Sequence, residues 1–345
     1  MQDERQFPWK GKDDIVRKLE ISAQEAGQRL DRMLAKYMEL APKSFIYKML
    51  RKKNIKLNGK KAEGNEKLQA GDEIILFLAD DTIDGFRQQK KEAVNISKKI
   101  DLDIVFEDED ILVVNKPVDM LSQKADKNDI SLIEHLTDYL LKKDGLHQEQ
   151  TFRPGICNRL DRNTSGLIVA GKSIQGLQWM NQLFRERKLK KYYLCIVKGK
   201  IEKGSRIDGY LLKDGSHNTV TISKEEKPGA DRIETEYEPL QKGMLDGKEY
   251  TLLKVHLITG KSHQIRAHLQ SIGHPIVGDG KYGHKDLYKI FKKEFGLRHQ
   301  LLHAWKLELD APEYLPGKYH NQTFMAPLPK EFVRILKGLG MSEPV

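Results

Sequence analysis

The segment 154–170 constrains the fold most, because it joins a charged turn directly to an uninterrupted apolar run. Asp161 stands between Arg159 and Arg162, and the small polar residues 163–166 follow soon after. The run 167–170 is apolar throughout, which predicts a buried strand, and the residues before it predict a surface turn. Rigid strands that end in exposed loops often present functional side chains. A carboxylate held there can act as a hydrogen-bond acceptor, a base or a nucleophile.

An Arg-Leu-Asp triplet by itself favours a plainer interpretation, a surface ion pair or a turn cap. The longer string, R-L-D-x-x-T-S-G-L from Arg159 onward, resembles the signature of the Rlu-type pseudouridine synthases, which isomerise uridine in structured RNA. The resemblance implies that Asp161 is the catalytic residue, and we expect Arg159 to contact the RNA. The family string usually begins with His, where this chain has Asn158. This departure puts a flanking contact in question but leaves the acid in place.

The composition is that of a folded protein with a strongly charged surface. The chain has 345 residues, enough for two or more domains, with 39% hydrophobic and 32% charged residues and a net charge of +10. The positive charge permits a polyanionic partner. Two cysteines, Cys157 and Cys195, offer neither a disulfide framework nor zinc-ligand spacing. No apolar run is long enough to span a membrane and the N-terminus is polar, so we expect a cytoplasmic location.

The segment 20–80 predicts a small α/β module. Two groups of apolar residues recur at helical spacing, and Pro42 and Ser44 fit a break and a helix start between them. Two short strands are predicted at 55–57 and 71–77, the first ending in an Asn-Gly turn. The apolar residues of the two helices are Leu30, Met33, Leu34 and Tyr37, followed by Ile46, Met49 and Leu50.

Between positions 41 and 61 the module carries eight basic residues and no acidic one. Such a run is often only a solvated face, but it can also contact phosphates without reading sequence. The order R-L-D, Ser-x-x-x-K, N-G-K and G-D-x-I over 28–78 resembles the alpha-L RNA-binding domain first seen in a ribosomal small-subunit protein, which favours RNA. The residues expected to contact RNA are Lys43, Lys48, Arg51, Lys52, Lys53 and Lys56, with Lys60 and Lys61 beside them.

Two further strands of a catalytic domain carry motif residues. A hairpin is predicted from 104–106 and 111–114, and its string E-D-x-x-I-L-V-V-N-K-P resembles the opening motif of the same synthases. After predicted helices at 131–141 and 174–188, the string K-x-Y-x-C-x-V-x-G resembles their second motif, in which a Tyr stacks on the target base. That resemblance points to Tyr193, while Tyr192 is the alternative and is expected on the opposite face of the strand. Seven bases and one acid lie within 185–200.

The string T-G-K-S-H-Q-I-R-A-H-L, positions 259–269, predicts a helix capped by Ser262, with Arg266 at the edge of its buried stripe. It resembles the third motif of the family, which implies that Arg266 pairs with Asp161. Lys261, where relatives often carry Arg, and His263 are expected to contact RNA. His263 and His268 are five apart and no Glu follows His263, so no metal site is expected.

We therefore predict an α+β protein with a mixed, mainly antiparallel central sheet, flanking helices and the small α/β module. The expected segments are an extension at 1–19, the module at 20–80, a linker at 81–99, the catalytic domain at 100–335 and a tail at 336–345. The expected activity is isomerisation of uridine in large-subunit ribosomal RNA by a monomer, with no cofactor and no membrane. The alternatives are a non-catalytic RNA-binding or ribosome-assembly factor, or a synthase acting on transfer RNA. A deaminase would need paired zinc-binding cysteines, which the sequence lacks.

Overall fold

The computed structural model describes residues 16–87, 100–126, 128–143, 151–215, 219–310 and 312–344. The chain divides into two compact units. The first is drawn from Met1–Asn95, Leu140–Arg153 and Ser173–Gln175, and the second from the remaining residues.

The first unit contains the predicted α/β module. Its four strands form one sheet in the order β1-β4-β2-β3. Both predicted helices are present, since each buries the apolar stripe seen in the sequence. Asn58 and Gly59 have φ of 50° and 73°, the left-handed turn that an Asn-Gly pair favours between strands. The elements are β1 (Val16–Glu20), α1 (Leu30–Tyr37), α2 (Lys43–Arg51), β2 (Ile55–Leu57), β3 (Lys60–Lys61), β4 (Glu73–Phe77) and α3 (Asp80–Gly85).

Three predicted segment boundaries are wrong. Strand β1 pairs with β4 from Val16, inside the predicted extension. Helix α3 starts at Asp80 and buries Ile83 in the core of the module, so the linker does not begin at 81. A single apolar side chain in a polar stretch creates no periodicity that a sequence could reveal. At the other end, Leu336, Leu339 and Met341 are buried, so the predicted tail packs into the second unit. Positions 1–15 and 88–99 of these segments lie outside the described residues.

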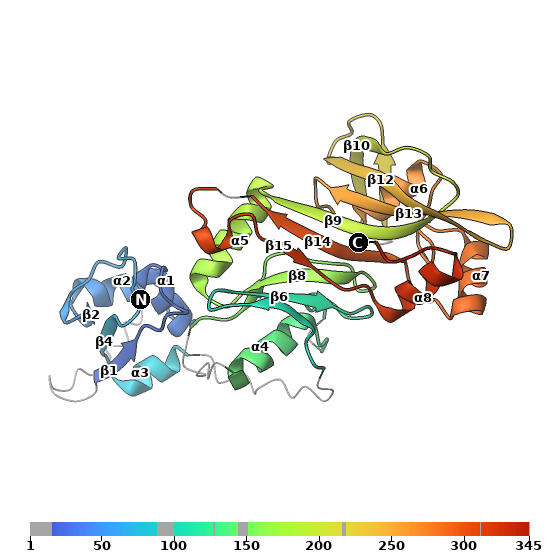
Figure 1. The fold of residues 1–345 in the computed structure, drawn as a ribbon. Coiled ribbons are helices and arrows are strands. Elements are labelled where there is room, and N and C mark those ends of the chain that lie inside the picture. The colour runs from blue at the N-terminus through green and yellow to red at the C-terminus, as the bar shows by residue number, and fades with distance from the viewer. Residues whose placement is uncertain are drawn as a thin grey trace. The chain divides into compact units, whose positions relative to one another are not determined.

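The second unit is built on one 11-stranded sheet (Figure 1). Its main strand order is β11-β10-β12-β13-β9-β14-β8-β6-β5, with β15 beside β14 and β7 beside β8. Within the described ranges the pairs are antiparallel except β8 with β14. The strands are β5 (Ile104–Glu107), β6 (Ile111–Lys116), β7 (Gly155–Ile156), β8 (Ser165–Gly171), β9 (Leu189–Lys198), β10 (Ser205–Asp214), β11 (Thr219–Ser223), β12 (Asp231–Leu245), β13 (Lys248–Leu257), β14 (Leu302–Leu309) and β15 (Thr323–Met325).

Helices cover both faces of this sheet, which explains why β6 and β8 are continuous apolar runs rather than alternating ones. One face, here called the Tyr193 face, also carries Val114, Ile168 and Val255, and α4 and α6 pack on it. On the other side, α5 packs on Leu167 of β8, while α7 and α8 pack on strand β9. The helices are α4 (Leu132–Lys143), α5 (Ile174–Glu186), α6 (Gln264–Ser271), α7 (Lys285–Phe295), α8 (Lys330–Gly338) and a 3-10 turn, η1 (Gly317–Tyr319).

The predicted fold class is confirmed: the chain is α+β with a mainly antiparallel sheet and a separate small module. The predicted hairpin is the antiparallel pair of β5 and β6. The predicted buried strand is β8, all seven residues of which are buried. No helix among the described residues has the length and apolar character needed to cross a bilayer.

Candidate functional site

Asp161 lies in the loop between β7 and β8, and hydrogen bonds fix the residues that precede it in this loop. Before it, the buried Leu160 exchanges hydrogen bonds with the Ser122 hydroxyl, at 2.8 and 3.0 Å. Asn158 donates to the Leu167 carbonyl (3.1 Å) and accepts from the Val169 amide (2.9 Å). The residue that departs from the family pattern therefore anchors the loop to β8. The Asp161 side chain itself stays 27% exposed.

Arg266, on α6, holds the Asp161 carboxylate as predicted. Its Nη1 donates to Oδ2 of Asp161 at 2.8 Å, across 105 positions of sequence. The Arg266 side chain is only 7% exposed, so it lies deeper than the predicted edge of the helix. A charge-assisted bond from a buried guanidinium stabilises the negative charge of the carboxylate and fixes its direction.

Asp279 holds the rest of the Arg266 guanidinium. Nε and Nη2 of Arg266 donate to its two oxygens at 2.7 and 2.9 Å, while the amides of Lys281 and Tyr282 donate to Oδ1 at 2.9 and 3.0 Å. Burial alone would lower the pKa of Arg266, but the hydrogen bond and charge of Asp279, and then Asp161, raise it above its ordinary value. Burial would raise the pKa of Asp279, and the Arg266 bond, its charge and the two amides lower it.

Asp279 lies ten residues beyond the end of the third motif and was not predicted as a site residue. A signal existed. A buried guanidinium presents a rigid fork of five N–H donors, and one half-exposed carboxylate cannot satisfy all of them. A second acid close to the third motif was therefore to be expected on hydrogen-bonding grounds.

Tyr193, on β9, lies on the same side of the sheet as α6 and is 8% exposed. Burial and then the charge of Asp161 raise the pKa of Tyr193, so its hydroxyl stays neutral close to the carboxylate. Tyr192 points to the opposite side, where it stacks on His256 with ring centroids 5.0 Å apart. The structure thus separates the two tyrosines as the strand alternation predicts.

His263 lies against Asp161, with its Nε2 3.8 Å from Oδ2 of that residue, and its Nδ1 is 3.0 Å from the Tyr282 hydroxyl. Burial lowers the pKa of His263, although the Asp161 charge opposes the shift. The other two predicted RNA contacts are at the surface. Arg159 is exposed, and Lys261, 43% exposed, pairs with Asp231 at 2.6 Å.

The predicted helix cap at Ser262 is wrong. Helix α6 starts one residue later, and its N-cap is His263 in a left-handed conformation, φ 57°, without a side-chain cap. The Gln264 side chain holds the loop before the helix, because its oxygen accepts bonds from the Lys261 amide (3.0 Å) and the Thr259 hydroxyl (2.9 Å). The strained turn directs His263 toward Asp161.

Lys116, at the end of β6, is a site residue that was not predicted from the sequence. Its side chain is fully buried, and Nζ donates to the carbonyls of Pro117 (2.8 Å), Met120 (2.9 Å) and Arg162 (3.0 Å). Burial lowers the pKa of Lys116 to about 7, while the charge of Asp161 acts in the opposite direction. The ammonium thereby ties the residue after Asp161 to the end of β6. In the sequence a buried lysine looks like any other lysine, so only the Asn-Lys-Pro string marked it.

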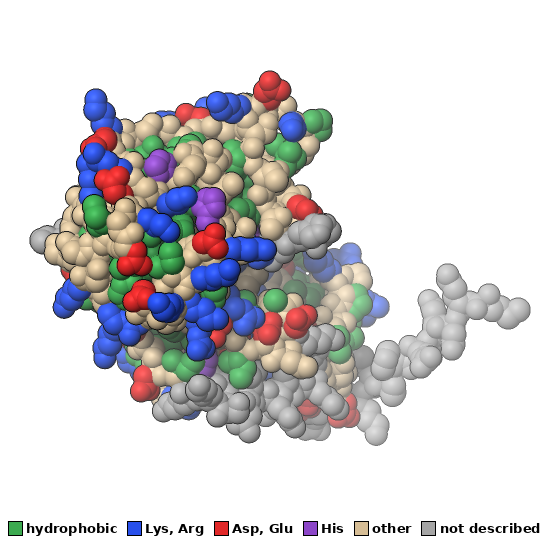
Figure 2. Space-filling view, turned by 90° about the vertical axis from the view of Figure 1, so that its right-hand side faces the viewer, with side chains coloured by type: hydrophobic (Ala, Val, Ile, Leu, Met, Phe, Trp, Pro, Cys, Tyr) green, Lys and Arg blue, Asp and Glu red, His purple; other side chains and the backbone are tan. Residues whose placement is uncertain are grey.

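The predicted RNA-binding residues of the first unit form an exposed basic surface. Lys56 is half-buried, with Nζ 4.9 Å from the centre of the Phe77 ring. No ion pair with an acid joins any of the predicted group among the described residues. Its exposed members are Lys43, Lys48, Arg51, Lys52 and Lys53. On the second unit, Figure 2 shows Lys and Arg side chains gathered across the middle of one face, with Asp, Glu and His among them.

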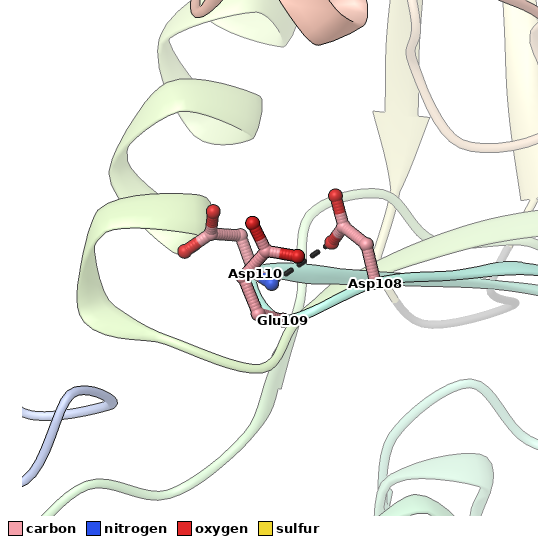
Figure 3. Close-up of side chains that lie close together, drawn as sticks. All are labelled: Asp108, Glu109 and Asp110. Atoms are coloured by element: carbon pink, nitrogen blue, oxygen red, sulfur yellow. Dashed lines mark hydrogen bonds between the residues drawn. The ribbon is translucent and has the colours of Figure 1, made fainter.

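One group of carboxylates within the described ranges is close enough to hold a metal ion: Asp108, Glu109 and Asp110, in the turn between β5 and β6 (Figure 3). A cation of the chain already lies there. Nζ of Lys318 is 3.0, 2.6 and 2.9 Å from the three acids, and the Tyr319 hydroxyl donates to Asp108. The cluster therefore gives no argument for a bound metal.

Comparisons with known proteins find matches for both regions of the chain that contain the motifs. Residues 110–271, which include Asp161, Tyr193 and Arg266, match the RNA pseudouridylate synthase family. Residues 28–74 match the S4 domain, within the predicted alpha-L module. The human protein RNA pseudouridylate synthase domain containing 4 has a similar fold, with a TM-score of 0.56 at 23% identity over 70% of this chain and 94% of that one.

Two relatives match over most of their length. Ribosomal large subunit pseudouridine synthase C of Pasteurella multocida is 32% identical over 335 residues, 94% of each protein. An uncharacterised RNA pseudouridine synthase of Mycoplasma genitalium is 32% identical over 298 residues, 85% of this chain and 89% of the relative. The motifs, the fold and these relatives agree, and the chain belongs to the family of RNA pseudouridine synthases.

Proposed function

We propose that the enzyme converts uridine to pseudouridine in large-subunit ribosomal RNA, with Asp161 as its catalytic residue. The observation that carries the assignment is a half-exposed carboxylate whose direction is set by a buried guanidinium, itself fixed by Asp279. This arrangement leaves one acid accessible to a substrate and keeps its counter-charge out of water. Electrostatic interactions are stronger in the protein interior than in water. The name of the Pasteurella multocida relative supports large-subunit ribosomal RNA as the substrate.

The isomerisation breaks the bond from ribose C1′ to N1, turns the base and joins C1′ to C5. The proton leaves C5 and N1 gains one, so no atom is lost and no redox change occurs. The reaction therefore needs no cofactor. Asp161 has three possible roles: attack on the base, attack on the sugar, or removal of a proton from the ribose. In each of them Arg266 stabilises the charge of Asp161 and keeps its carboxylate directed at the substrate.

The target base must leave its stack before Asp161 can reach it, at a cost of a few kcal/mol. Stacking on Tyr193 would return about 1–3 kcal/mol. Arg159, Lys261 and His263 are assigned to the RNA around that base. The basic surface of the first unit would hold the RNA through its phosphates without reading the sequence.

The test is to map pseudouridine in total RNA from cells with the gene, without it, and with the gene restored as wild type or Asp161→Asn. We expect one or more uridines of large-subunit ribosomal RNA to lose the modification without the gene. Wild type should restore it and Asp161→Asn should not. Sites confined to transfer RNA would overturn the substrate assignment, and restoration by the variant would overturn the role of Asp161.

A further inference from the structure

The basic segment 185–200 is only partly explained by the proposed function, which uses Tyr193 from it. Several of its cations have acidic neighbours. Lys200 pairs with Glu202, and Lys190 lies opposite Glu308 on β14. Lys191 lies opposite the apolar Leu307 of β14 instead, and no hydrogen bond or ion pair joins its ammonium to another side chain in the described part of the chain. The position and surroundings of this one cation therefore need an explanation.

Lys191 leaves β9 on the same side of the strand as Tyr193, and its partner on β14, Leu307, belongs to the core that α5 covers. It stands two residues before Tyr193, and alternate residues of a strand share a face and lie about 7 Å apart. Strand β13 pairs with β9 only as far as His256 opposite Tyr192, so Lys191 lies one residue beyond the last pair. Its ammonium is thus placed where the chain leaves β13, not within the sheet.

The chain that leaves β13 is the loop that leads to the catalytic helix. A methyl group built on Gly260 would lie 3.5 Å from Nζ of Lys191. The preceding residue, Thr259, donates its hydroxyl to Gln264 at 2.9 Å, and Gln264 opens the helix that carries Arg266. Gly260 is exposed, so the Lys191 ammonium lies at the solvent-facing rim of this loop.

The positive charge of Lys191 is uncompensated. The side chain is half-buried, and burial, followed by the charge of Arg187, lowers the pKa of Lys191 to about 8 with no carboxylate acting against them. By contrast, Lys261 in the adjoining loop has Asp231 as a partner. A half-buried ammonium without a counter-charge is unfavourable, so an anion at this position would be favoured.

We propose that Lys191 binds a backbone phosphate of the substrate RNA beside the nucleotide that stacks on Tyr193. The inference rests on the proposed function and extends it. A phosphate suits this side chain, because an ammonium is a compact point charge that needs no fixed fork of donors. Such a contact carries no sequence information. Lys191 therefore positions the strand at the catalytic loop, while the choice of uridine depends on other contacts.

The structural alternative is that Lys191 only covers apolar surface with its stem and leaves its ammonium in water. Two variants separate these roles. Lys191→Met keeps an unbranched stem and removes the charge, whereas Lys191→Arg keeps the charge. Lys190→Met is the matched control, since Lys190 is exposed and its side chain leaves the same strand on the opposite face.

The experiment measures binding and turnover of a large-subunit ribosomal RNA transcript over a range of salt concentrations, together with the melting temperature of each variant. Lys191→Met should raise KM and the dissociation constant about tenfold and leave kcat within about twofold. The slope of log affinity against log salt should become shallower by about 0.7–0.9, the value for one lost phosphate contact. Lys191→Arg and Lys190→Met should keep the wild-type slope.

A wild-type slope for Lys191→Met would overturn the proposed contact, and so would a loss of kcat or melting temperature without a change in slope. Both results would indicate a packing role. A further outcome is that the wild type forms no pseudouridine while Lys191→Met weakens RNA binding as expected. That result would count against the proposed function alone and would support the contact.

Discussion

Arg266 connects two carboxylates that differ in accessibility, and this difference defines the site at the scale of single residues. Three of its N–H groups donate to carboxylates, two to the fully buried Asp279 and one to the half-exposed Asp161. Asp279 can therefore act only through Arg266, as a positioning residue. Asp161 keeps an accessible side for the substrate.

Asp279→Asn should lower kcat about 100-fold, because an amide cannot hold the Arg266 fork in the productive direction. The free energy of unfolding should fall by about 3–5 kcal/mol, since a buried charge loses its partner. KM for RNA should stay close to wild type, and single-turnover kinetics with urea unfolding measure all three quantities. Asp231→Asn, which removes an exposed ion pair with Lys261, is the control and should cost less than about 1 kcal/mol. A wild-type kcat for Asp279→Asn would refute the positioning role.

Lys116 should make the stability of the protein depend on pH. Burial lowers the pKa of Lys116 to about 7 from its ordinary 10.5, so between these values the unfolded chain binds more protons than the folded one. The free energy of unfolding should rise with pH in this window, by at most about 1.4 kcal/mol per unit. Urea unfolding of wild type and Lys116→Met at about pH 6, 7, 8 and 9 isolates the contribution of Lys116 to this pH dependence. The difference between the two proteins should favour wild type increasingly above pH 7, and a constant difference would contradict the lowered pKa of Lys116.

The residues of the site differ in how far the sequence alone could identify them. Long strings that resemble family motifs contain Asp161, Arg266 and Tyr193. It could therefore be predicted that these three residues lie close together. Asp279 could have been inferred from the hydrogen-bonding needs of Arg266, and Lys116 could not. Burial of a lysine depends on which backbone carbonyls the fold brings around it, here from three separate positions.

Gly166 shows at the scale of elements why β8 and β14 can lie side by side. It has φ of 114°, and a methyl group on it would lie 2.2 Å from the carbonyl oxygen of Ala304. Ala304 is its partner in the parallel pair of β8 and β14. Only a residue without a side chain allows this approach, which brings the Asp161 loop to the strand that neighbours Tyr193.

Gly166→Ala should therefore lower the free energy of unfolding by more than about 3 kcal/mol, since overpacking and backbone strain add. Chemical unfolding monitored by circular dichroism measures the change. Gly317→Ala is the matched control, because no atom lies within 4 Å of a methyl group there, and it should change stability by less than about 0.5 kcal/mol. Equal stability of the two variants would show that the strands can separate without cost.

The sequence predicted long periodic elements well and isolated ones poorly. Helix α1 carries a full apolar stripe, whereas α3 has one buried residue, Ile83, and its sequence resembles a linker. At α6 the serine that favours a cap is bypassed, because the chain enters the helix through His263 in a left-handed conformation and the helix begins at Gln264. Local capping preferences are weak enough for such a tertiary arrangement to override them.

The whole molecule combines two units with different tasks in the proposed function. The first carries an unpaired basic surface and the second carries Asp161, Arg266 and Tyr193. The net charge of +10 is thus partly concentrated on a module that is small and has no candidate catalytic residues. Affinity for RNA should depend on the first unit, while turnover of bound RNA depends on the second.

Replacing Lys48 and Lys52 together by Gln should make the slope of log affinity against log salt shallower by about 1.4–1.8, two phosphate contacts. The rate of a single turnover at saturating enzyme should change less than about twofold, since neither residue belongs to the catalytic unit. The matched control replaces Lys285 and Lys289, exposed residues of α7, and should keep the wild-type slope. The interpretation fails if both pairs change the slope equally.

The most direct test of the central claim is a single-turnover measurement with purified Asp161→Asn on an RNA that the wild type modifies. The substitution removes the negative charge and keeps the size of a side chain that is 27% exposed, so folding and RNA binding should remain within about twofold of wild type. The account predicts bound RNA without any pseudouridine, even after long incubation. Pseudouridine formed by this variant at a rate close to that of wild type would contradict it.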